Sequence, residues 1–533
     1  MVEEDVSAEV TAATFAQYYT KSVFGVNMLY YRNDFRYLDY EFEDVLKLFF
    51  LKDELQKADG PWDYGSGAFL FCGFETAAAS LCISLKSHGF QEQASIPVSE
   101  ELSALFQGQR PESLGNMKES RPDVKFFKKV FKRKLYLLLK SFTGKSSPWG
   151  VMTGIRPAKL VNELMDAGAG EQDIVNKLVE DYYVAGSKAQ LLYEVAGNQR
   201  ELFKDSAPEN VSLYVGIPFC PTRCLYCSFS SSTIGQYKKQ VDSYLEALLK
   251  EIRHTGELLR SCGLKIESIY IGGGTPTSVN SLQLNRLLEG LESLLDLSSM
   301  KEYTLEAGRP DTIDDGKLKV IKDSRVTRIS INPQSMNETT LKRIGRGHTP
   351  QEVEKAFYNA RSLGFDNINM DVICGLPGED AVMFKNSMEQ LSRMKPDSVT
   401  VHTMAVKRAS RLNLERDNFS LHKEFDQVSE MVETAGAYAA ELGLRPYYLY
   451  RQKNILGNLE NVGYSKKGKE CLYNIQIMEE RQSVFACGAG AVTKIVFPGN
   501  RLERSFNVKS VEEYLGRIDE MLERKKILIA NWL

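Results

Sequence analysis

Three cysteines lie within eight positions of the segment GIPFCPTRCLYCSF, which covers residues 216–229. Three residues separate Cys220 from Cys224 and two separate Cys224 from Cys227, and an apolar stretch typical of a buried strand comes directly before them. This spacing can place three thiolates on one face of a tight loop. Thiolates are ligands of both zinc and iron–sulfur clusters, so the segment predicts a metal site.

Two kinds of metal centre fit three neighbouring cysteines. A structural zinc ion normally has four nitrogen or sulfur ligands, but the next histidine is His254, and the next cysteine, Cys262, follows a predicted helix. A [4Fe–4S] cluster normally binds four thiolates, and three would leave one iron open for a small ligand. The spacing and the position after a strand favour the three-cysteine iron–sulfur cluster, and zinc is the alternative.

The composition of the chain narrows its class. With 533 residues and 43% hydrophobic content, the chain is long enough for two or three domains. Its net charge of −3 does not suggest a nucleic-acid partner, and no apolar run reaches the ~18 residues that a membrane span requires. The start, MVEEDVSAEV, is acidic and unlike a signal peptide, and the scattered cysteines show no paired rhythm. We therefore expect a cytoplasmic protein with reduced thiols.

From Val211 to about Leu444 the sequence alternates short β-rich runs with longer helical patterns. Apolar residues in the longer stretches recur at the three- and four-residue intervals of an amphipathic helix. Six repeats of strand and helix predict parallel strands with helical crossovers, and six units rather than eight predict an α/β fold with a partial (β/α)6 barrel. The expected strands are residues 212–218, 265–274, 302–308, 325–335, 367–377 and 398–406.

Polar residues gather near the carboxyl ends of these expected strands. A strand buried on both faces should be almost wholly apolar, and the carboxyl ends of barrel strands meet at one mouth. One polar residue there would only start an ordinary turn, whereas several in register predict a ligand site. In strand order they are Cys220, Gly272–Thr277, Glu306, Gln334, Asp371, and His402 with Thr403.

The remaining parts of the chain differ in character. We expect residues 1–205 to form an N-terminal α+β domain of unknown role, with a strand at 67–74 and a basic amphipathic helix at 124–142 whose charged face is solvated. The barrel would occupy residues 206–445. Residues 446–533 would form a small mixed C-terminal region on the substrate side.

Several longer motifs resemble one known family. The CxxxCxxC loop, with Tyr226 before its third cysteine, resembles the radical S-adenosylmethionine (SAM) superfamily. The strings YVGIPFCPTRCLYC, YIGGGTPTS, TLEAGRP, ISINPQS, GRGH and NMDVICGLPG narrow the resemblance to the oxygen-independent coproporphyrinogen III oxidase family, and most closely to its coproporphyrinogen dehydrogenase branch. These motifs cover about residues 211–410, and PYYLYRQKN and SPWGVMTGIRPAKL extend the likeness on either side.

The resemblance implies which residues hold the cofactors. The three cysteines would ligate a [4Fe–4S] cluster, whose open iron would take the amino and carboxylate groups of SAM. Tyr214 and Tyr226 would pack against the cluster and cofactor, with ordinary aromatic core as the alternative. Thr403 would lie near a second SAM, and for Arg346 the alternative is a solvated arginine. The other SAM-binding positions would be Gly273, Gly274, Thr275, Glu306, Gln334, Arg346 and Asp371.

The resemblance also implies a reaction. Hydrogen would be removed from a propionate of coproporphyrinogen III and CO2 lost to leave a vinyl group, at two propionates, giving protoporphyrinogen IX for heme biosynthesis. An electron donor and an electron acceptor, both unidentified, would be partners. Because this substrate carries four carboxylates, we expect a cationic mouth. The candidate cations are Arg309, Arg328, Lys407, Arg408 and Arg451.

Two alternatives to this function remain open. A heme-binding chaperone on the same barrel would use a His-Asn-x-x-Tyr-Trp stretch, but the corresponding segment 473–478 lacks the histidine, so Met478 or Cys471 would have to bind heme. A radical SAM enzyme acting on another substrate is the second alternative, because fold and cofactor do not fix the substrate. Phe229 and Gly216 stand where the best-studied branch has a cysteine and a histidine, which changes how protons and substrate would be handled.

Overall fold

The computed structural model describes residues 28–58, 67–75, 78–99, 102, 121–204, 206–229, 232–407, 409–414, 421–497 and 501–530. The chain divides into two compact units. The first contains Met1–Gly154 and Glu171–Gln190, and the second contains Ile155–Gly170 and Leu191–Leu533.

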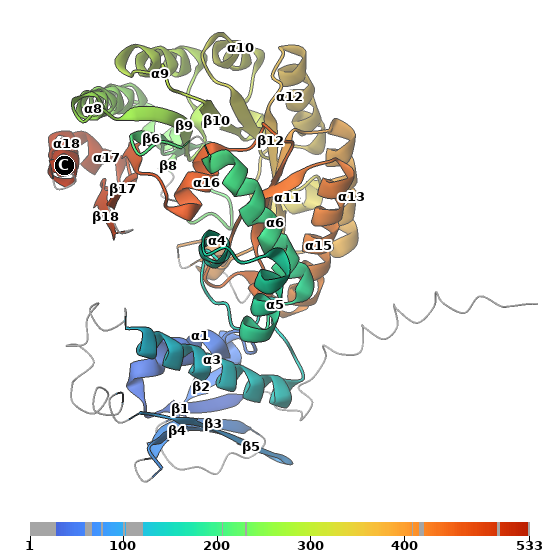
Figure 1. Cartoon of the computed structure of the whole chain (residues 1–533). Coiled ribbons are helices and arrows are strands. Elements are labelled where there is room, and N and C mark those ends of the chain that lie inside the picture. Colours follow the sequence, from blue (N-terminus) through green and yellow to red (C-terminus); the bar gives the residue numbers. More distant parts are fainter. Residues whose placement is uncertain are drawn as a thin grey trace, which may run out of the picture. The chain divides into compact units, whose positions relative to one another are not determined.

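Six neighbouring parallel strands form the centre of the second unit (Figure 1). Their order in the sheet is their order in the chain, and every crossover carries at least one helix. This arrangement confirms the predicted α/β fold with a partial (β/α)6 barrel. The strands are β6 (Asn210–Ile217), β9 (Lys265–Gly273), β10 (Glu302–Gly308), β11 (Arg328–Ile331), β12 (Ile368–Cys374) and β13 (Ser398–Thr403). The helices are α8 (Val241–Ser261), α9 (Ser281–Leu294), α10 (Asp315–Asp323), α11 (Glu338–Arg343), α12 (Pro350–Ser362), α13 (Ala381–Met394), α14 (Arg411–Leu414) and α15 (Leu421–Glu441).

Amphipathic helices cover the outside of this sheet (Figure 1). On α8, for example, the buried residues Leu245, Leu248 and Ile252 recur at three- and four-residue intervals and so share one face. Helix α9 begins at Asn280, whose side chain accepts a hydrogen bond from the backbone N–H of Gln283 at 2.9 Å. Side-chain capping therefore marks the start of α9, and apolar periodicity sets which face of α8 is buried.

The segment after Leu444 extends this sheet at both edges. Strands β15 (Asn461–Ser465) and β14 (Arg445–Tyr450) add antiparallel neighbours beyond β13. Strand β16 (Val484–Cys487) pairs parallel to β6, and β17 (Val492–Phe497) and β18 (Arg501–Phe506) follow it. Between these additions lies α16 (Leu472–Glu479). The boundaries 205 and 445 of the proposed functional regions stay a prediction.

One buried carboxylate ties the C-terminal helices α17 (Val511–Gly516) and α18 (Ile518–Ala530) to α8. Glu251 accepts hydrogen bonds from the backbone N–H of Gly488 and from Asn507 Nδ2, both at 2.7 Å, and from the hydroxyl of Tyr514. It also forms an ion pair with Lys525, and both of these charged side chains are almost fully buried. The C-terminal segment is thus held by one ion pair and three hydrogen bonds that saturate a single carboxylate.

The first unit contains a five-stranded sheet in the order β2-β1-β3-β4-β5, counted over its described residues. The predicted strand at 67–74 is β3 (Ala68–Glu75), and the predicted basic helix is α3 (Pro122–Thr143), whose apolar face is buried. Its basic residues are not all solvated, because Lys128 pairs with Glu41 at 3.0 Å. The other elements are β1 (Leu29–Asn33), β2 (Leu55–Lys57), β4 (Ser80–Ser87), β5 (Phe90–Pro97), α1 (Asp39–Leu46) and α5 (Glu171–Tyr182); α4 (Ala158–Asp166) lies in the second unit and α6 (Gly186–Phe203) runs into it.

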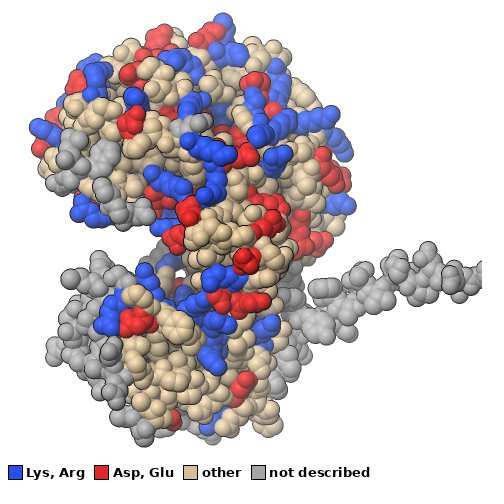
Figure 2. All heavy atoms as spheres, viewed as in Figure 1, with Lys and Arg blue, Asp and Glu red and all other residues tan. Residues whose placement is uncertain are grey.

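Charged side chains of both signs are interspersed on the face drawn in Figure 2. This mixture agrees with the small net charge of −3. Within the described ranges, no helix is both long enough and apolar enough to span a membrane.

Candidate active site

A cavity of about 490 Å³ opens at the carboxyl ends of the barrel strands. All thirteen residues that the sequence predicts to hold the cluster or SAM line it, so residues from Tyr214 to Thr403 meet at one place. Their roles stay predictions, but the barrel topology brings them together as expected. They are Tyr214, Cys220, Cys224, Tyr226, Cys227, Gly273, Gly274, Thr275, Glu306, Gln334, Arg346, Asp371 and Thr403.

The loop that carries the cysteines follows β7 (Phe219–Cys220), which pairs with β8 (Ser232–Thr233) ahead of α7 (Ile234–Tyr237). The N–H of Leu225 donates to the carbonyl of Ile344 at 2.9 Å and anchors the middle of the loop. Three thiols along one wall of the cavity are the right donors for a cluster. Within the described part of the chain, no three Cys, His, Asp or Glu side chains converge on one metal position.

The backbone at the end of β9, at Gly273 and Gly274, packs directly against the segment that leads into the cysteine loop. The N–H of Gly274 donates to the carbonyl of Ile217, and that of Thr275 donates to the carbonyl of Phe219, both at 2.7 Å. A Cβ on Gly274 would lie only 2.5 Å from the Phe219 carbonyl oxygen. Glycine is required here because two backbones meet, and the contact brings Thr275 Oγ1 to 3.6 Å from Cys220 Sγ.

Gln334 has a strained backbone and an unused side-chain acceptor. Its φ of +68° lies in the left-handed region, and bonds to β12 hold it there: its N–H donates to Asp371 O at 2.9 Å, and its carbonyl accepts from Ile373 N at 3.0 Å. Its buried Oε1 has no hydrogen-bond partner among the described residues. Burying an acceptor without a hydrogen-bond partner costs free energy. Strained backbone conformations such as this one are found most often at active sites and ligand-binding positions. Gln334 thus fits a ligand-binding role.

Arg346 points at the same part of the cavity. Its Nη2 donates to the hydroxyl of Tyr226 at 2.9 Å and its Nη1 to the carbonyl of Asn332 at 3.2 Å, while the buried Nε has no partner. Burial opposes the charge, but Tyr226 and Cys224 hold the pKa of Arg346 above its ordinary value. Burial also raises the pKa of the Tyr226 phenol. The arginine therefore stays a cation, and with Gln334 it leaves unsatisfied polar atoms for a polar cofactor beside the thiols.

Glu306, near the end of β10, is a cavity carboxylate whose pKa lies close to neutral pH. Burial raises its pKa to about 7; the charge of Asp371 adds to the shift, and a hydrogen bond from the Tyr270 hydroxyl opposes it. Tyr270 was not expected from the sequence, although it occupies the tyrosine position of the YIGGG motif. Because this carboxyl can be neutral or ionised near pH 7, its affinity for a polar ligand should depend on pH.

Asp371 lies at the cavity in a group with His402 and Tyr450. Its Oδ2 lies 3.7 Å from His402 Nε2, and His402 Nδ1 lies 3.2 Å from the Tyr450 hydroxyl. Burial raises the pKa of Asp371, but His402 and the side-chain amide of Asn369, which donates at 2.7 Å, outweigh it and hold the pKa below its ordinary value. Asp371 is therefore ionised at neutral pH, and it lies next to His402 at the cavity wall.

A stack of tyrosines forms another wall. The ring of Tyr473, from α16, lies 4.6 Å from that of Tyr270 and 6.0 Å from that of Tyr214. Tyr473, Tyr448 and Tyr450 come from the C-terminal segment, and the sequence did not name them as cluster or SAM ligands. Thr403 also lines the cavity, but its hydroxyl donates to the carbonyl of Glu460 at 2.7 Å. That bond leaves Thr403 less suited to a second SAM than the sequence suggests.

The predicted cationic mouth is only partly present. Arg328 and Lys407 line the cavity, and burial lowers the pKa of Lys407. Arg309 also lines it, but its guanidinium is bound to the cysteine loop. Arg451 does not: its side chain is buried and donates to the carbonyl of Asn458 at 2.9 Å, which corrects its assignment as a substrate ligand. Arg408 lies outside the described residues.

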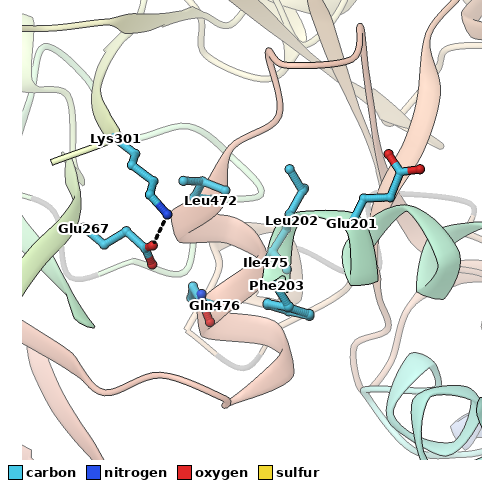
Figure 3. Close-up of a pocket in the computed structure, with 8 residues that line it drawn as sticks. All are labelled: Glu201, Leu202, Phe203, Glu267, Lys301, Leu472, Ile475 and Gln476. Carbon is cyan, nitrogen blue, oxygen red and sulfur yellow. Dashed lines mark hydrogen bonds and ion pairs between the residues drawn. The ribbon is translucent and has the colours of Figure 1, made fainter. Parts of the chain in front are cut away.

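A second, smaller cavity of about 190 Å³ lies beside the amino end of β9 (Figure 3). Lys301 donates to Glu267 at 2.8 Å on one side of it, and Leu472 and Ile475 of α16 line another side (Figure 3). Glu267 is further held by Gln482 Nε2 at 2.7 Å. The amino ends of barrel strands generally serve stability, so this cavity is not the candidate active site.

Comparisons with known proteins agree with this fold. The model of the radical SAM superfamily matches residues 214–391, which places the chain in the radical SAM class. The superfamily uses a [4Fe–4S] cluster and SAM, and these are the cofactors of this chain. The donor set of the cavity fits both groups.

Relatives define the family within that class. The chain is 41% identical to the oxygen-independent coproporphyrinogen-III oxidase-like protein HemZ of Bacillus subtilis over 392 residues, which are 73% of this chain and 78% of HemZ. It is 32% identical to the heme chaperone HemW of Lactococcus lactis over 282 residues, which are 52% of this chain and 68% of HemW. A solved structure, coproporphyrinogen III oxidase (HemN) from Escherichia coli, is similar with a TM-score of 0.46 and 21% identity over 61% of this chain and 73% of HemN. The chain belongs to the oxygen-independent coproporphyrinogen III oxidase-like family, as its motifs indicate.

Proposed function

We propose that the protein catalyses the oxygen-independent oxidative decarboxylation of two propionates of coproporphyrinogen III to vinyl groups, giving protoporphyrinogen IX. The observation that supports this most is the lining of one cavity in a HemZ-like chain. Cysteines and SAM-type residues line it together with tyrosine rings and Met478. Aromatic faces suit a tetrapyrrole, whose individual pyrrole rings can pack against them.

The chain's own residues would bind and orient the reactants. The three cysteines would hold the cluster, and Glu306, Gln334, Arg346 and Asp371 would hold SAM through hydrogen bonds and charge. When bound, the cluster and SAM together supply a 5′-deoxyadenosyl radical that removes hydrogen from the substrate. The buried cavity excludes water from that step, and one electron per propionate has to leave for an acceptor.

Other residues that line the cavity would bind the carboxylates and the tetrapyrrole ring of the substrate. Lys407 lies at the edge of the cavity beside Cys227 and is the candidate cation for a propionate. His402 would supply a hydrogen-bond donor near the reacting carbon. We place the protein in the cytoplasm, where reduced thiols and an oxygen-sensitive cluster persist.

A heme chaperone is the second candidate function, because HemW relatives cover much of this chain. Of its two possible ligands, Cys471 is buried and its thiol donates to Glu302 at 3.3 Å, so only Met478 lines the cavity. Burial raises the pKa of Cys471 further from the thiolate form that would bind iron. The geometry therefore favours the enzyme over the chaperone.

One anaerobic comparison tests these functions. The protein is reconstituted with iron and sulfide and supplied with SAM, a reductant and coproporphyrinogen III. Protoporphyrinogen, CO2 and deoxyadenosine support the proposed reaction. Stoichiometric heme binding without decarboxylation would favour the chaperone, and deoxyadenosine without porphyrinogen turnover would indicate another substrate. Met478→Leu is the matched variant, because it should abolish heme uptake by a chaperone and leave decarboxylation largely intact.

A further inference from the structure

Arg309 is 2% exposed and follows the end of β10, next to the cysteine loop. Its Nη1 donates to Thr222 Oγ1 at 2.8 Å and to the Thr222 carbonyl at 3.2 Å, and it lies 3.9 Å from Cys224 Sγ. Its Nε and Nη2 donate to the two carboxylate oxygens of Asp311 at 3.0 and 2.7 Å. The guanidinium is therefore bidentate to one carboxylate and at the same time faces a thiol.

These contacts leave little of Arg309 for the substrate role that the sequence suggested. A guanidinium has five N–H groups in a fixed plane, and the two on Nη1, the one on Nε and one of the two on Nη2 have partners here. Thr222 in turn donates to the Gly345 carbonyl at 3.0 Å, so the arginine, the loop and the turn before Arg346 are one connected network. Arg309 thus acts on the loop and its sulfur.

We propose that Arg309 is a positioning residue for the iron–sulfur cluster: it fixes the cysteine loop through Thr222 and raises the cluster's reduction potential through its charge beside Cys224. The inference rests on the proposed ligation of the cluster by Cys224. Net charge and hydrogen bonds to the sulfurs set the potential of such clusters. A buried positive charge stabilises the state that carries one extra electron, and little solvent screens it. That electron comes from an external low-potential one-electron donor, and no bond forms or breaks in this step.

Substitutions of Arg309 and of Asp311 should shift the reduction potential of the cluster in opposite directions. Asp311 is the counter-charge of Arg309, with a side chain 19% exposed. Arg309→Gln removes a positive charge and leaves the negative one, which should make the potential more negative. Asp311→Asn does the reverse and should make it more positive. Thr222→Val removes a loop hydrogen bond without changing charge, so it should weaken retention of iron and leave the potential unchanged.

The test measures the midpoint potential of the reconstituted full-length protein by anaerobic spectroelectrochemistry, with iron and sulfide content determined for each variant. We expect opposite shifts for Arg309→Gln and Asp311→Asn, a potential near wild type for Arg309→Lys, and faster iron loss to a chelator for Thr222→Val. Equal potentials in wild type and both charge variants, with full clusters, would overturn the inference and leave the proposed function standing. If Arg309→Gln does not assemble a cluster, the Asp311→Asn shift decides the question. A wild-type protein that assembles no cluster would overturn the proposed function itself, and the inference with it.

Discussion

The pKa of Glu306 makes SAM binding dependent on pH in a calculable way. In the protein without SAM, burial raises this pKa to about 7, and the hydroxyl of Tyr270 is the only donor that bonds to it within the described residues. We propose that SAM binds the ionised carboxylate, which accepts hydrogen bonds and complements the positive sulfonium. Binding below pH 7 then has to remove a proton from Glu306, so the affinity should rise with pH.

The size of the change in SAM affinity follows from the fraction of Glu306 that is ionised at each pH. With a pKa of about 7, roughly 9% of Glu306 is ionised at pH 6 and roughly 91% at pH 8. The apparent Kd equals the intrinsic Kd divided by the competent fraction, so it should be about tenfold weaker at pH 6 than at pH 8. The number of protons released per SAM bound should fall from about 0.9 at pH 6 to about 0.1 at pH 8.

Anaerobic isothermal titration of SAM into the reconstituted protein measures both quantities, when it is repeated in buffers of different ionisation enthalpy. Glu306→Gln should remove the pH dependence from pH 6 to 8. Glu379 is the matched control, because burial raises its pKa to about 7 as well but it lies outside the cavity. Glu379→Gln should therefore keep the wild-type slope. A pH-independent Kd in the wild type, or equal slopes in the wild type and Glu306→Gln, would refute the reasoning.

Three further predictions concern the same unit. Lys525→Met leaves the buried carboxylate of Glu251 without its counter-charge and should lower the free energy of unfolding by about 3–5 kcal/mol, measured by urea denaturation; a loss under about 1 kcal/mol contradicts this. Cys224→Ala should abolish iron binding but leave the circular dichroism spectrum unchanged, and retained SAM cleavage would show that Cys224 is not a ligand. Gln334→Gly should relieve about 1 kcal/mol of backbone strain and raise the thermal midpoint slightly while weakening SAM binding; unchanged SAM affinity would remove Gln334 from the site.

Most of the barrel could be predicted from the sequence because its signals are local. Strand and helix periods are read over ten to twenty residues, and parallel strands connected by helices have few possible arrangements. For the same reason, polar residues at strand ends, such as Glu306 and Asp371, were expected to meet. The motif resemblance then supplied the cofactors, which the family match supports.

The assignments that failed or were missed depend on contacts between distant segments. Arg451 and Arg309 look alike as candidate cations in the sequence, but one is buried against the carbonyl of Asn458 and the other binds Thr222. His402 contacts Tyr450 only because β14, a strand of the C-terminal segment, joins the sheet antiparallel to β15. No local pattern reports such a pairing.

The sequence by itself favoured an iron–sulfur cluster over zinc, and it determined the strand–helix alternation and the edge of the sheet where polar groups gather, since spacing and periodicity act within one element. The tertiary structure decided the charge state and the partner of each polar group. Those depend on burial and on which remote side chain lies within hydrogen-bond distance, as with Tyr270 beside Glu306 and Arg309 beside Cys224. Burial and proximity are properties of the packed chain, and no single segment encodes them.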